Sequence, residues 1–168
     1  GLLAPTAGSV YYKGENLFHY RQKRMEEYRR TQVGVVFQDY KLLDHLTVRD
    51  NMILPLMLEH RDVGAAVRKV EEMADRLQIA GRLEYYPGEL SGGEKQRAAI
   101  GRALMNDPEL ILADEPTGNL DEASGRIVME LLTGLQKEMH KTLILVTHDK
   151  EIADYCDRTI MIRDGRIS

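Results

Sequence analysis

Hydrophobic positions recur along the chain in two patterns, one typical of buried strands and one typical of amphipathic helices. Mostly apolar runs occupy residues 33–37, 110–113 and 141–147, and polar residues flank each run. Short continuous runs of this kind predict strands buried in a parallel sheet. Apolar residues three and four positions apart predict helices over residues 63–80 and from residue 122 to about residue 140. The alternation therefore predicts an α/β fold.

Capping and turn residues predict where several of these elements begin and end. Thr47 is a suitable N-cap for a helix that begins at Val48. Pro55 lies inside that helical pattern and is expected to end or kink it, because proline lacks a backbone N–H. Gly81 is a plausible C-cap for the helix over 63–80, since glycine tolerates the left-handed backbone of a helix end.

The two ends of the chain carry weaker patterns. Residues 1–8 indicate a helix end followed by a turn, residues 9–12 a short strand, and residues 13–16 a second turn. A helix is expected over residues 19–30 and a short one over residues 150–155. The last ten residues predict a hairpin that turns on Asp164-Gly165, a pair suited to a tight two-residue turn.

Composition narrows the classes of protein. A chain of 168 residues is long enough for one domain with its own core. Its 23 basic and 27 acidic residues give a net charge of −4, which offers no reason to expect nucleic-acid binding. The basic cluster over residues 21–30 is interrupted by Glu26 and Glu27 and is interpreted as a solvated helix face. A single cysteine, Cys156, suits a reducing compartment. No apolar run in these residues is long enough to span a membrane, and no signal peptide is expected.

One run in the middle of the chain is suited to binding an anion. Two glycines after a serine let backbone N–H groups approach a ligand closely, and a helix over 94–106 is expected to follow them. Unpaired N–H groups and the positive end of the helix dipole favour phosphate there. Ser91 and Glu94 also fit an ordinary helix N-cap, and both interpretations stay open for these residues alone. The run reads Leu90-Ser91-Gly92-Gly93-Glu94-Lys95-Gln96-Arg97.

Polar side chains follow each of the three predicted strands. Gln38 follows the first, Asp114 and Glu115 follow the second, and His148 follows the third. Taken singly, each could close a strand without further function. In an open α/β sheet, however, ligands bind at the carboxyl ends of the strands. Neighbouring strand residues point to opposite faces, so adjacent carboxylates at a strand end can serve two roles.

Together these motifs, in this order, resemble those of ABC-type ATPases. The run from Leu90 to Arg97 resembles the signature motif, Phe37-Gln38 the Q-loop and Val146-Thr147-His148-Asp149 the H-loop. The stretch over 109–116 resembles Walker B followed by its catalytic glutamate, and the run over 117–121 resembles the D-loop. The resemblance covers the whole chain and implies a P-loop NTPase-like fold with an inserted helical subdomain. It assigns residues 1–38 and 90–168 to the core and residues 39–89 to that subdomain.

The resemblance also implies roles for individual residues. It implies ATP and Mg²⁺ as cofactors, with Asp114 organising the metal ion and Gln38 contacting both the metal and the attacking water. Glu115 would act as general base, and His148 would sense the γ-phosphate. Residues of the signature motif would close over ATP held by a second subunit, and Asp121 would lie in the D-loop at that dimer interface while also capping the next helix. The signature residues concerned are Ser91, Gly92, Gly93 and Glu94.

Partners and location are likewise implied by the resemblance. An ABC ATPase subunit pairs with a copy of itself or with a second such subunit, and it contacts an integral-membrane permease through the helical subdomain, on the cytoplasmic face of the membrane. Leu54, Pro55, Leu56 and Met57 could line a groove for a partner helix, although a core position is an equal alternative. The pattern Asn51–Leu56 and the D-loop are similar to the branch that serves lipoprotein release, macrolide export, antimicrobial-peptide resistance and cell division.

The chain departs from the family at one motif. It contains no Gly-x-x-x-x-Gly-Lys-Ser/Thr sequence, which cradles the β- and γ-phosphates in this family. We therefore expect an N-terminal truncation, with a parent protein that hydrolyses ATP and a segment of 168 residues that is inactive alone. The alternative for the parent is a non-transport ABC ATPase, of a DNA-repair or ribosome-associated type.

Overall fold

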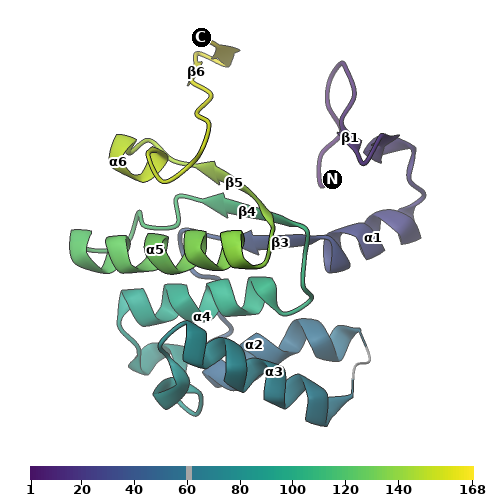
Figure 1. Ribbon diagram of the computed structural model, residues 1–168. Helices are drawn as coiled ribbons and strands as arrows, with labels where there is room; N and C mark the ends of the chain where they lie inside the picture. Colours follow the sequence, from purple (N-terminus) through teal and green to yellow (C-terminus); the bar gives the residue numbers. More distant parts are fainter. Residues whose placement is uncertain (60–61) are drawn as a thin grey trace.

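A three-stranded parallel sheet forms the centre of the computed structural model, which describes residues 1–59 and 62–168 (Figure 1). Its strands are β3 (Val33–Val36), β4 (Leu110–Asp114) and β5 (Thr142–Val146), in the order β3-β4-β5. The register pairs Val36 with Ala113 and Asp114 with Val146. The α/β class with a parallel sheet, predicted from the sequence, is confirmed.

Two helices cover one face of this sheet. Helix α4 (Gly92–Leu104) packs on β3, and α5 (Glu122–Glu138) packs on α4 and β5 (Figure 1). Strand and helix residues there form a continuous apolar core, because every second strand residue points at the helices. The core members on these elements are Val36, Ala98, Ile100, Leu104, Ile111, Ala113, Val128, Met129, Leu132 and Leu135.

A helical layer lies on the other side of α4, between β3 and α4 in the sequence (Figure 1). It comprises α2 (Val48–Leu58), α3 (Val63–Arg76) and the short 3₁₀ turns η2 (Ala80–Arg82) and η3 (Pro87–Glu89). The layer approaches α4 closely at Gly101, where an added Cβ would lie 2.6 Å from Met52 Cε and 3.0 Å from Leu77 Cδ1. Glycine at this position therefore permits the tight helix packing.

The helices expected from residues 19 and 94 begin at Gln22 and Gly92 instead, the start of α2 agrees with its predicted cap, and two expected helix ends are wrong. Thr47 accepts a hydrogen bond from Asp50 N and caps α2 as predicted. Pro55 does not end α2, which runs on to Leu58, because packing of the helix against α4 offsets the single hydrogen bond that proline omits. Gly81 is not the C-cap of α3, which ends at Arg76 with Leu77 as its C-cap.

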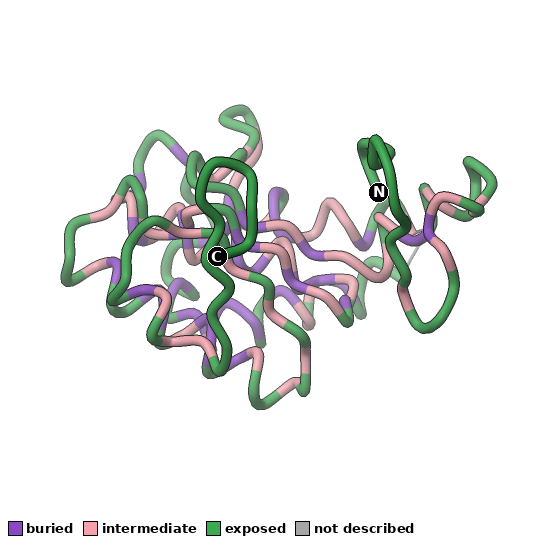
Figure 2. Tube along the Cα trace, turned by 90° about the horizontal axis from the view of Figure 1, so that it is seen from above, coloured by how far each residue is buried: buried purple, intermediate pink, exposed green. Residues whose placement is uncertain are grey.

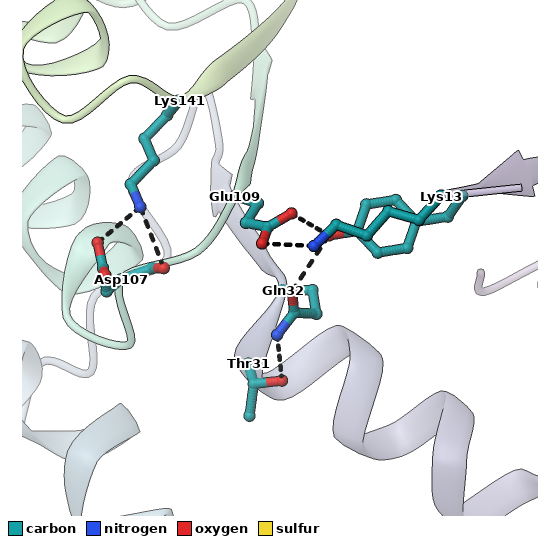
Figure 3. Close-up of polar contacts among 7 residues, drawn as sticks. Lys13, Thr31, Gln32, Asp107, Glu109 and Lys141 are labelled. Carbon is teal, nitrogen blue, oxygen red and sulfur yellow. Dashed lines mark hydrogen bonds and ion pairs between the residues drawn. The ribbon is translucent and has the colours of Figure 1, made fainter.

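The N-terminal segment is a hairpin followed by a helix. Strands β1 (Tyr11–Tyr12) and β2 (Glu15–Asn16) are followed by η1 (Leu17–His19) and α1 (Gln22–Thr31). No helix occurs over residues 1–8, so the helix end expected there is wrong. Figure 3 shows how the hairpin is fastened to the start of β4. Lys13 Nζ lies 2.6 Å from Glu109 Oε1, and the Tyr12 hydroxyl donates to Glu109 Oε2 at 2.8 Å. Burial and this carboxylate together raise the pKa of Tyr12.

The C-terminal part contains β5, α6 (Lys150–Ala153), β6 (Ile162–Arg163) and β7 (Arg166–Ile167). Asp164 and Gly165 both have positive φ, at 48° and 73°, so the predicted hairpin turn is confirmed. The expectation that β5 is fully buried is wrong. It lies at the edge of the sheet, with Ile144 51% and Val146 58% exposed. Figure 2 shows the terminal hairpin as exposed along its length. No helix in the described ranges is long and apolar enough to cross a membrane.

Candidate active site

The carboxyl ends of the three parallel strands bring the predicted site residues to one edge of the sheet. Gln38 follows β3, Asp114 closes β4 with Glu115 directly after it, and His148 follows β5. Because β4 pairs with both neighbours in parallel, these strand ends lie side by side. The sheet thus positions polar groups that are more than 30 residues apart in the sequence.

Glu115 and His148 are in direct contact. Glu115 Oε1 lies 2.6 Å from His148 Nδ1 and also accepts a hydrogen bond from the backbone N–H of His148 at 2.9 Å. The Thr147 hydroxyl donates to Glu115 Oε2 at 3.0 Å. Three donors from the loop after β5 therefore hold one carboxylate that follows β4. The arrangement leaves the His148 side chain 87% exposed, open to a ligand beyond the sheet edge.

The backbone at Glu115 turns sharply to make these contacts possible. Its φ is 42°, in the left-handed region that non-glycine residues rarely occupy. Its N–H still donates to Val146 O at 2.9 Å, and its C=O accepts from Gly118 N at 3.0 Å. Both backbone groups are satisfied, so the chain leaves β4 through a defined turn and aims the side chain along the sheet edge toward β5. Such backbone strain is typical of functional sites.

The contact shifts the pKa of both partners. Partial burial acts to raise the pKa of Glu115, but the hydrogen bonds from His148 and Thr147 outweigh it and the net shift is downward. The hydrogen bond to Glu115, with its negative charge, raises the pKa of His148. Each group therefore stabilises the charged form of the other. At neutral pH Glu115 is an ionised carboxylate, the form that a general base requires.

Gln38 lies next to a different loop. Its Nε2 is directed at Asn119 Oδ1 at 3.5 Å, and its backbone carbonyl accepts from Asn119 Nδ2 at 3.0 Å. Since Nε2 is used in this way, the carboxamide oxygen Oε1 is the atom left to accept a ligand. The structure thus brings Glu115 and His148 together directly, and places Gln38 at the same edge but against the loop that follows β4.

Oxygen donors suitable for Mg²⁺ are present at this edge. Asp114 ends β4 as an exposed carboxylate, and the Gln38 carboxamide lies after the neighbouring strand. In the described part of the chain, no three His, Cys, Asp or Glu side chains gather as a metal cluster. Magnesium bound with a nucleotide needs only one or two protein oxygens besides phosphate and water. The donor set therefore fits a metal ion that arrives with its nucleotide.

The signature run caps α4. The Ser91 side chain accepts from Glu94 N at 3.3 Å and donates to Glu94 Oε2 at 2.8 Å, so Ser91 and Glu94 form a capping box. Arg82 Nε contacts Glu94 Oε1 at 2.6 Å. Its hydrogen bond, with those from Ser91, lowers the pKa of Glu94 to about 2. Ser91 lies at the surface, at the first turn of a helix whose N–H groups point outward.

Asp121 occupies the corresponding position on α5. Its side chain accepts from Ser124 N at 2.9 Å and caps the helix, as the sequence indicates. This hydrogen bond is the main cause of the lowered pKa of Asp121. The capping interpretation is therefore confirmed for both Ser91 and Asp121. Their expected roles at a subunit interface remain predictions.

Four residues beside the site were not singled out from the sequence. Thr147 and Asn119 contact Glu115 and Gln38, and Arg82 contacts Glu94. Gln96 is fully buried and donates through Nε2 to Phe37 O at 3.3 Å, which ties α4 to the end of β3. Thr147 and Asn119 lie inside quoted motifs, so a search for hydroxyl and amide donors within those motifs would have found them. No spacing rule predicts the Arg82 contact.

Comparisons with known proteins identify the family of this chain. The family model described as ABC transporter matches residues 1–118. The ABC transporter ATP-binding protein YxdL of Bacillus subtilis is 44% identical over 163 residues, covering 97% of this chain and 63% of the relative. The bacitracin export ATP-binding protein BceA of Halalkalibacterium halodurans is 40% identical over 160 residues, and the match covers 95% of this chain and 63% of the relative. The chain thus spans 63% of the length of each relative.

A solved structure shows the same fold. This structure is the ATP-binding cassette MJ0796, determined as a dimer in a post-hydrolysis state bound to ADP and Pi. It matches this chain with a TM-score of 0.87 and 35% sequence identity, and the match covers 99% of this chain and 73% of the MJ0796 chain. The chain belongs to the ABC transporter family. The family predicted from the motifs is confirmed, and its members similar to this chain include a bacitracin export ATP-binding protein.

Proposed function

We propose that this chain is part of the ATP-hydrolysing subunit of an ABC transporter, in which MgATP hydrolysis drives a membrane permease. One observation carries the proposal most directly: the Glu115 carboxylate, held by His148 and Thr147, lies where the parallel strands end. Ligands of open α/β sheets bind at that edge. The bacitracin export relative and the ADP-bound cassette make a nucleotide the expected ligand.

In this proposal the strand-end residues divide the chemistry. Glu115 accepts a proton from the attacking water as general base, and its ionised state at neutral pH suits that role. His148, charged more readily because of Glu115, faces the γ-phosphate. Asp114 and the Gln38 carboxamide oxygen would hold Mg²⁺, which would neutralise charge on the phosphates.

The signature motif serves a second subunit. Ser91 is exposed at the start of α4, followed by Gly92 and the buried Gly93, and none of the hydrogen bonds described for Ser91 involves Gln38, Glu115 or His148. We propose that they close over ATP held by a sister subunit, with Asp121 near the same interface. The dimeric state of the solved relative supports this arrangement. The pair of subunits then holds two nucleotides between them.

The first prediction compares MgATP binding by these 168 residues alone with binding by the full-length protein. The 168 residues contain no Walker A sequence. In P-loop ATPases, the backbone and the lysine of that motif make most contacts to the β- and γ-phosphates. We expect the segment to show negligible MgATP binding by titration calorimetry, whereas the full-length protein should bind and hydrolyse MgATP. Micromolar affinity of the segment would contradict this account of the site. Absence of turnover in the full-length protein would contradict the proposed function.

A non-transport ABC ATPase is the alternative. No long coiled coil is present among the described helices, of which α5, with 17 residues, is the longest, and this argues against a DNA-organising relative. Affinity purification from native membranes separates the remaining possibilities. A transporter subunit should bring down an integral-membrane permease, whereas a ribosome-associated ATPase should bring down ribosomal proteins.

A groove beside β3 is suited to the permease. It measures about 350 Å³ and lies between the end of α1, β3, α2 and α4. Leu54 and Pro55 line it, and Leu58, on the same wall, is 61% exposed. Leu56, in contrast, is buried in the core, so the apolar run of α2 divides between groove and core. The cationic side chains at the groove are Arg29, Arg30, Lys41 and Arg102.

The charges in this groove suggest the chemistry of its partner. Four cations around apolar walls favour a helix with one apolar face and at least one acidic residue. Arg102 is already used, since it donates to Tyr40 O at 2.8 Å, and burial lowers its pKa. Arg29 contacts only a backbone carbonyl, Gly1 O at 3.0 Å, among the contacts described for it. Arg29 is therefore the cation most available to a carboxylate of the permease.

The second prediction tests this surface. Arg29→Glu should reduce co-purification of the permease by roughly tenfold, because a like charge then faces the acidic partner. ATP turnover of the isolated subunit should stay unchanged. Lys23→Glu makes the same charge reversal on α1 at a position that does not line the groove, and it should retain the permease. Equal loss in both variants would argue against a specific site.

A further inference from the structure

Two loops that follow neighbouring strands are joined by a pair of carboxamides. Asn119, on the loop after β4, donates from Nδ2 to the Gln38 backbone carbonyl at 3.0 Å. Gln38 Nε2 in turn is directed at Asn119 Oδ1 at 3.5 Å. The residues are 81 positions apart in the sequence, so this contact exists only in the folded chain. Asn119 therefore contacts both the backbone and the side chain of Gln38.

The Gln38 carboxamide also lies close to the backbone of Gly118. A Cβ added at Gly118 would lie 2.7 Å from Gln38 Nε2 and 3.1 Å from its Cδ, closer than real side chains approach. Glycine at position 118 therefore leaves room for the Gln38 side chain in this conformation, and a larger residue would displace it. The Gln38 carboxamide thus lies close to both Gly118 and Asn119.

The same loop also contacts the start of α4. The Tyr40 hydroxyl lies 3.5 Å from Asn119 O. A Cβ at Gly92 would lie 3.0 Å from Tyr40 Oη and 3.0 Å from Leu120 Cδ2. The loop carrying Asn119 is therefore packed on both sides, against the residues after β3 and against the first turn of α4. This packing gives the Asn119 side chain a fixed base from which to hold Gln38.

An unsupported glutamine at this position would be disordered. Gln38 is exposed, and its side chain has three rotatable torsions, so it loses much conformational freedom when one rotamer is held. Asparagine supplies a donor and an acceptor on a short, two-torsion side chain, which suits it to fixing another amide. No other side chain among the described residues donates to the Gln38 backbone carbonyl.

We propose that Asn119 is a positioning residue for Gln38. It holds the Gln38 backbone through Nδ2 and directs Nε2 away from the site, so that the carboxamide oxygen faces the bound nucleotide and metal. The proposal rests on the proposed function, because the orientation of Gln38 matters to turnover only if Gln38 acts on MgATP. Asn119 itself need not touch the nucleotide.

Two substitutions distinguish positioning from simple space filling. Asn119→Ala removes both contacts. Asn119→Asp keeps the size and the Oδ1 acceptor but replaces the donor Nδ2 with an oxygen that faces the Gln38 carbonyl. In the full-length protein both should lower kcat for MgATP about 3- to 10-fold, the worth of one neutral hydrogen bond, with KM within about twofold. Asn16→Asp is the matched control, since it adds the same charge at the half-buried end of β2, in the N-terminal hairpin, and keeps its own cap acceptor.

A double substitution tests whether Asn119 acts through Gln38. In a Gln38→Ala background, Asn119→Ala should have no further effect on kcat, because the group that it positions is gone. Additive losses would overturn the proposal, as would full activity of Asn119→Asp.

Hydrogen exchange separates failure of this inference from failure of the proposed function. If the wild-type protein shows no ATP turnover, the proposed function is wrong. The rate of backbone amide hydrogen exchange over residues 37–42 then tests whether Asn119 positions Gln38. Faster exchange there in Asn119→Asp than in Asn16→Asp supports it. Equal exchange in the two variants overturns it.

Discussion

Replacing Glu115 with glutamine should lower the ATP turnover of the full-length protein by roughly 10²–10⁴-fold, the usual contribution of a general base. Glutamine retains the size of the side chain, and its oxygen can still accept from the backbone N–H of His148, as Glu115 does at 2.9 Å. The fold and nucleotide binding should therefore persist while proton transfer from water is lost. Single-turnover phosphate release measures the chemical step directly.

The control for Glu115→Gln is the same substitution at an exposed residue. Glu130 lies on the exposed side of α5, and Glu130→Gln should leave turnover within about twofold, as surface substitutions rarely disturb a fold. Near-normal turnover of Glu115→Gln would remove Glu115 from the role of base. Loss of nucleotide binding together with turnover would instead indicate that Glu115 holds the site together.

The largest effect on stability is expected at Gly34 in β3. A Cβ at this position would lie 2.4 Å from the backbone carbonyl oxygen of Ala103 and 3.0 Å from Pro108 Cγ. A backbone carbonyl cannot rotate away as a side chain can, so Gly34→Ala must push α4 off the sheet. We expect a loss of about 1–3 kcal/mol in the free energy of unfolding, the usual cost of overpacking. Urea unfolding followed by circular dichroism measures it.

A second glycine provides the matched control. Gly134 lies in α5, is exposed, and has nothing within 4 Å of its Cβ position. Gly134→Ala should therefore stabilise the protein by up to about 1 kcal/mol, because alanine favours the helix. If Gly34→Ala were as stable as the wild type, the close approach of α4 to β3 would be wrong.

Signals in the sequence predicted those helix starts that depend only on residues close to one another in the chain. Thr47, Ser91 and Asp121 cap their helices as expected, because an N-cap needs only its own side chain and the next turn. Pro55 and Gly81 misled for the opposite reason. Whether a helix continues past them is decided by the surfaces against which it packs, and the sequence does not display those surfaces.

The burial of β5 also depends on what lies beside it. Its apolar residues predict a buried strand, but Ile144 and Val146 are half exposed at the edge of the described sheet. The same limit applies to the site. Strand ends placed Gln38, Glu115 and His148 at one edge, because parallel strands share their polarity. The partners that orient them, Thr147 and Asn119, depend on loop backbone geometry such as the positive φ of Glu115.

Helix α4 is approached closely on both flanks at glycines, by β3 at Gly34 and by α2 at its own Gly101. Because its neighbours leave no room for a side chain at Gly34 or Gly101, the helix has little space in which to repack when it is displaced. A shift imposed on the outer helices by a membrane partner would be carried through α4 as a rigid body. Ser91 caps the first turn of that helix, so in the proposed dimer such a shift would reach the nucleotide held by the sister subunit.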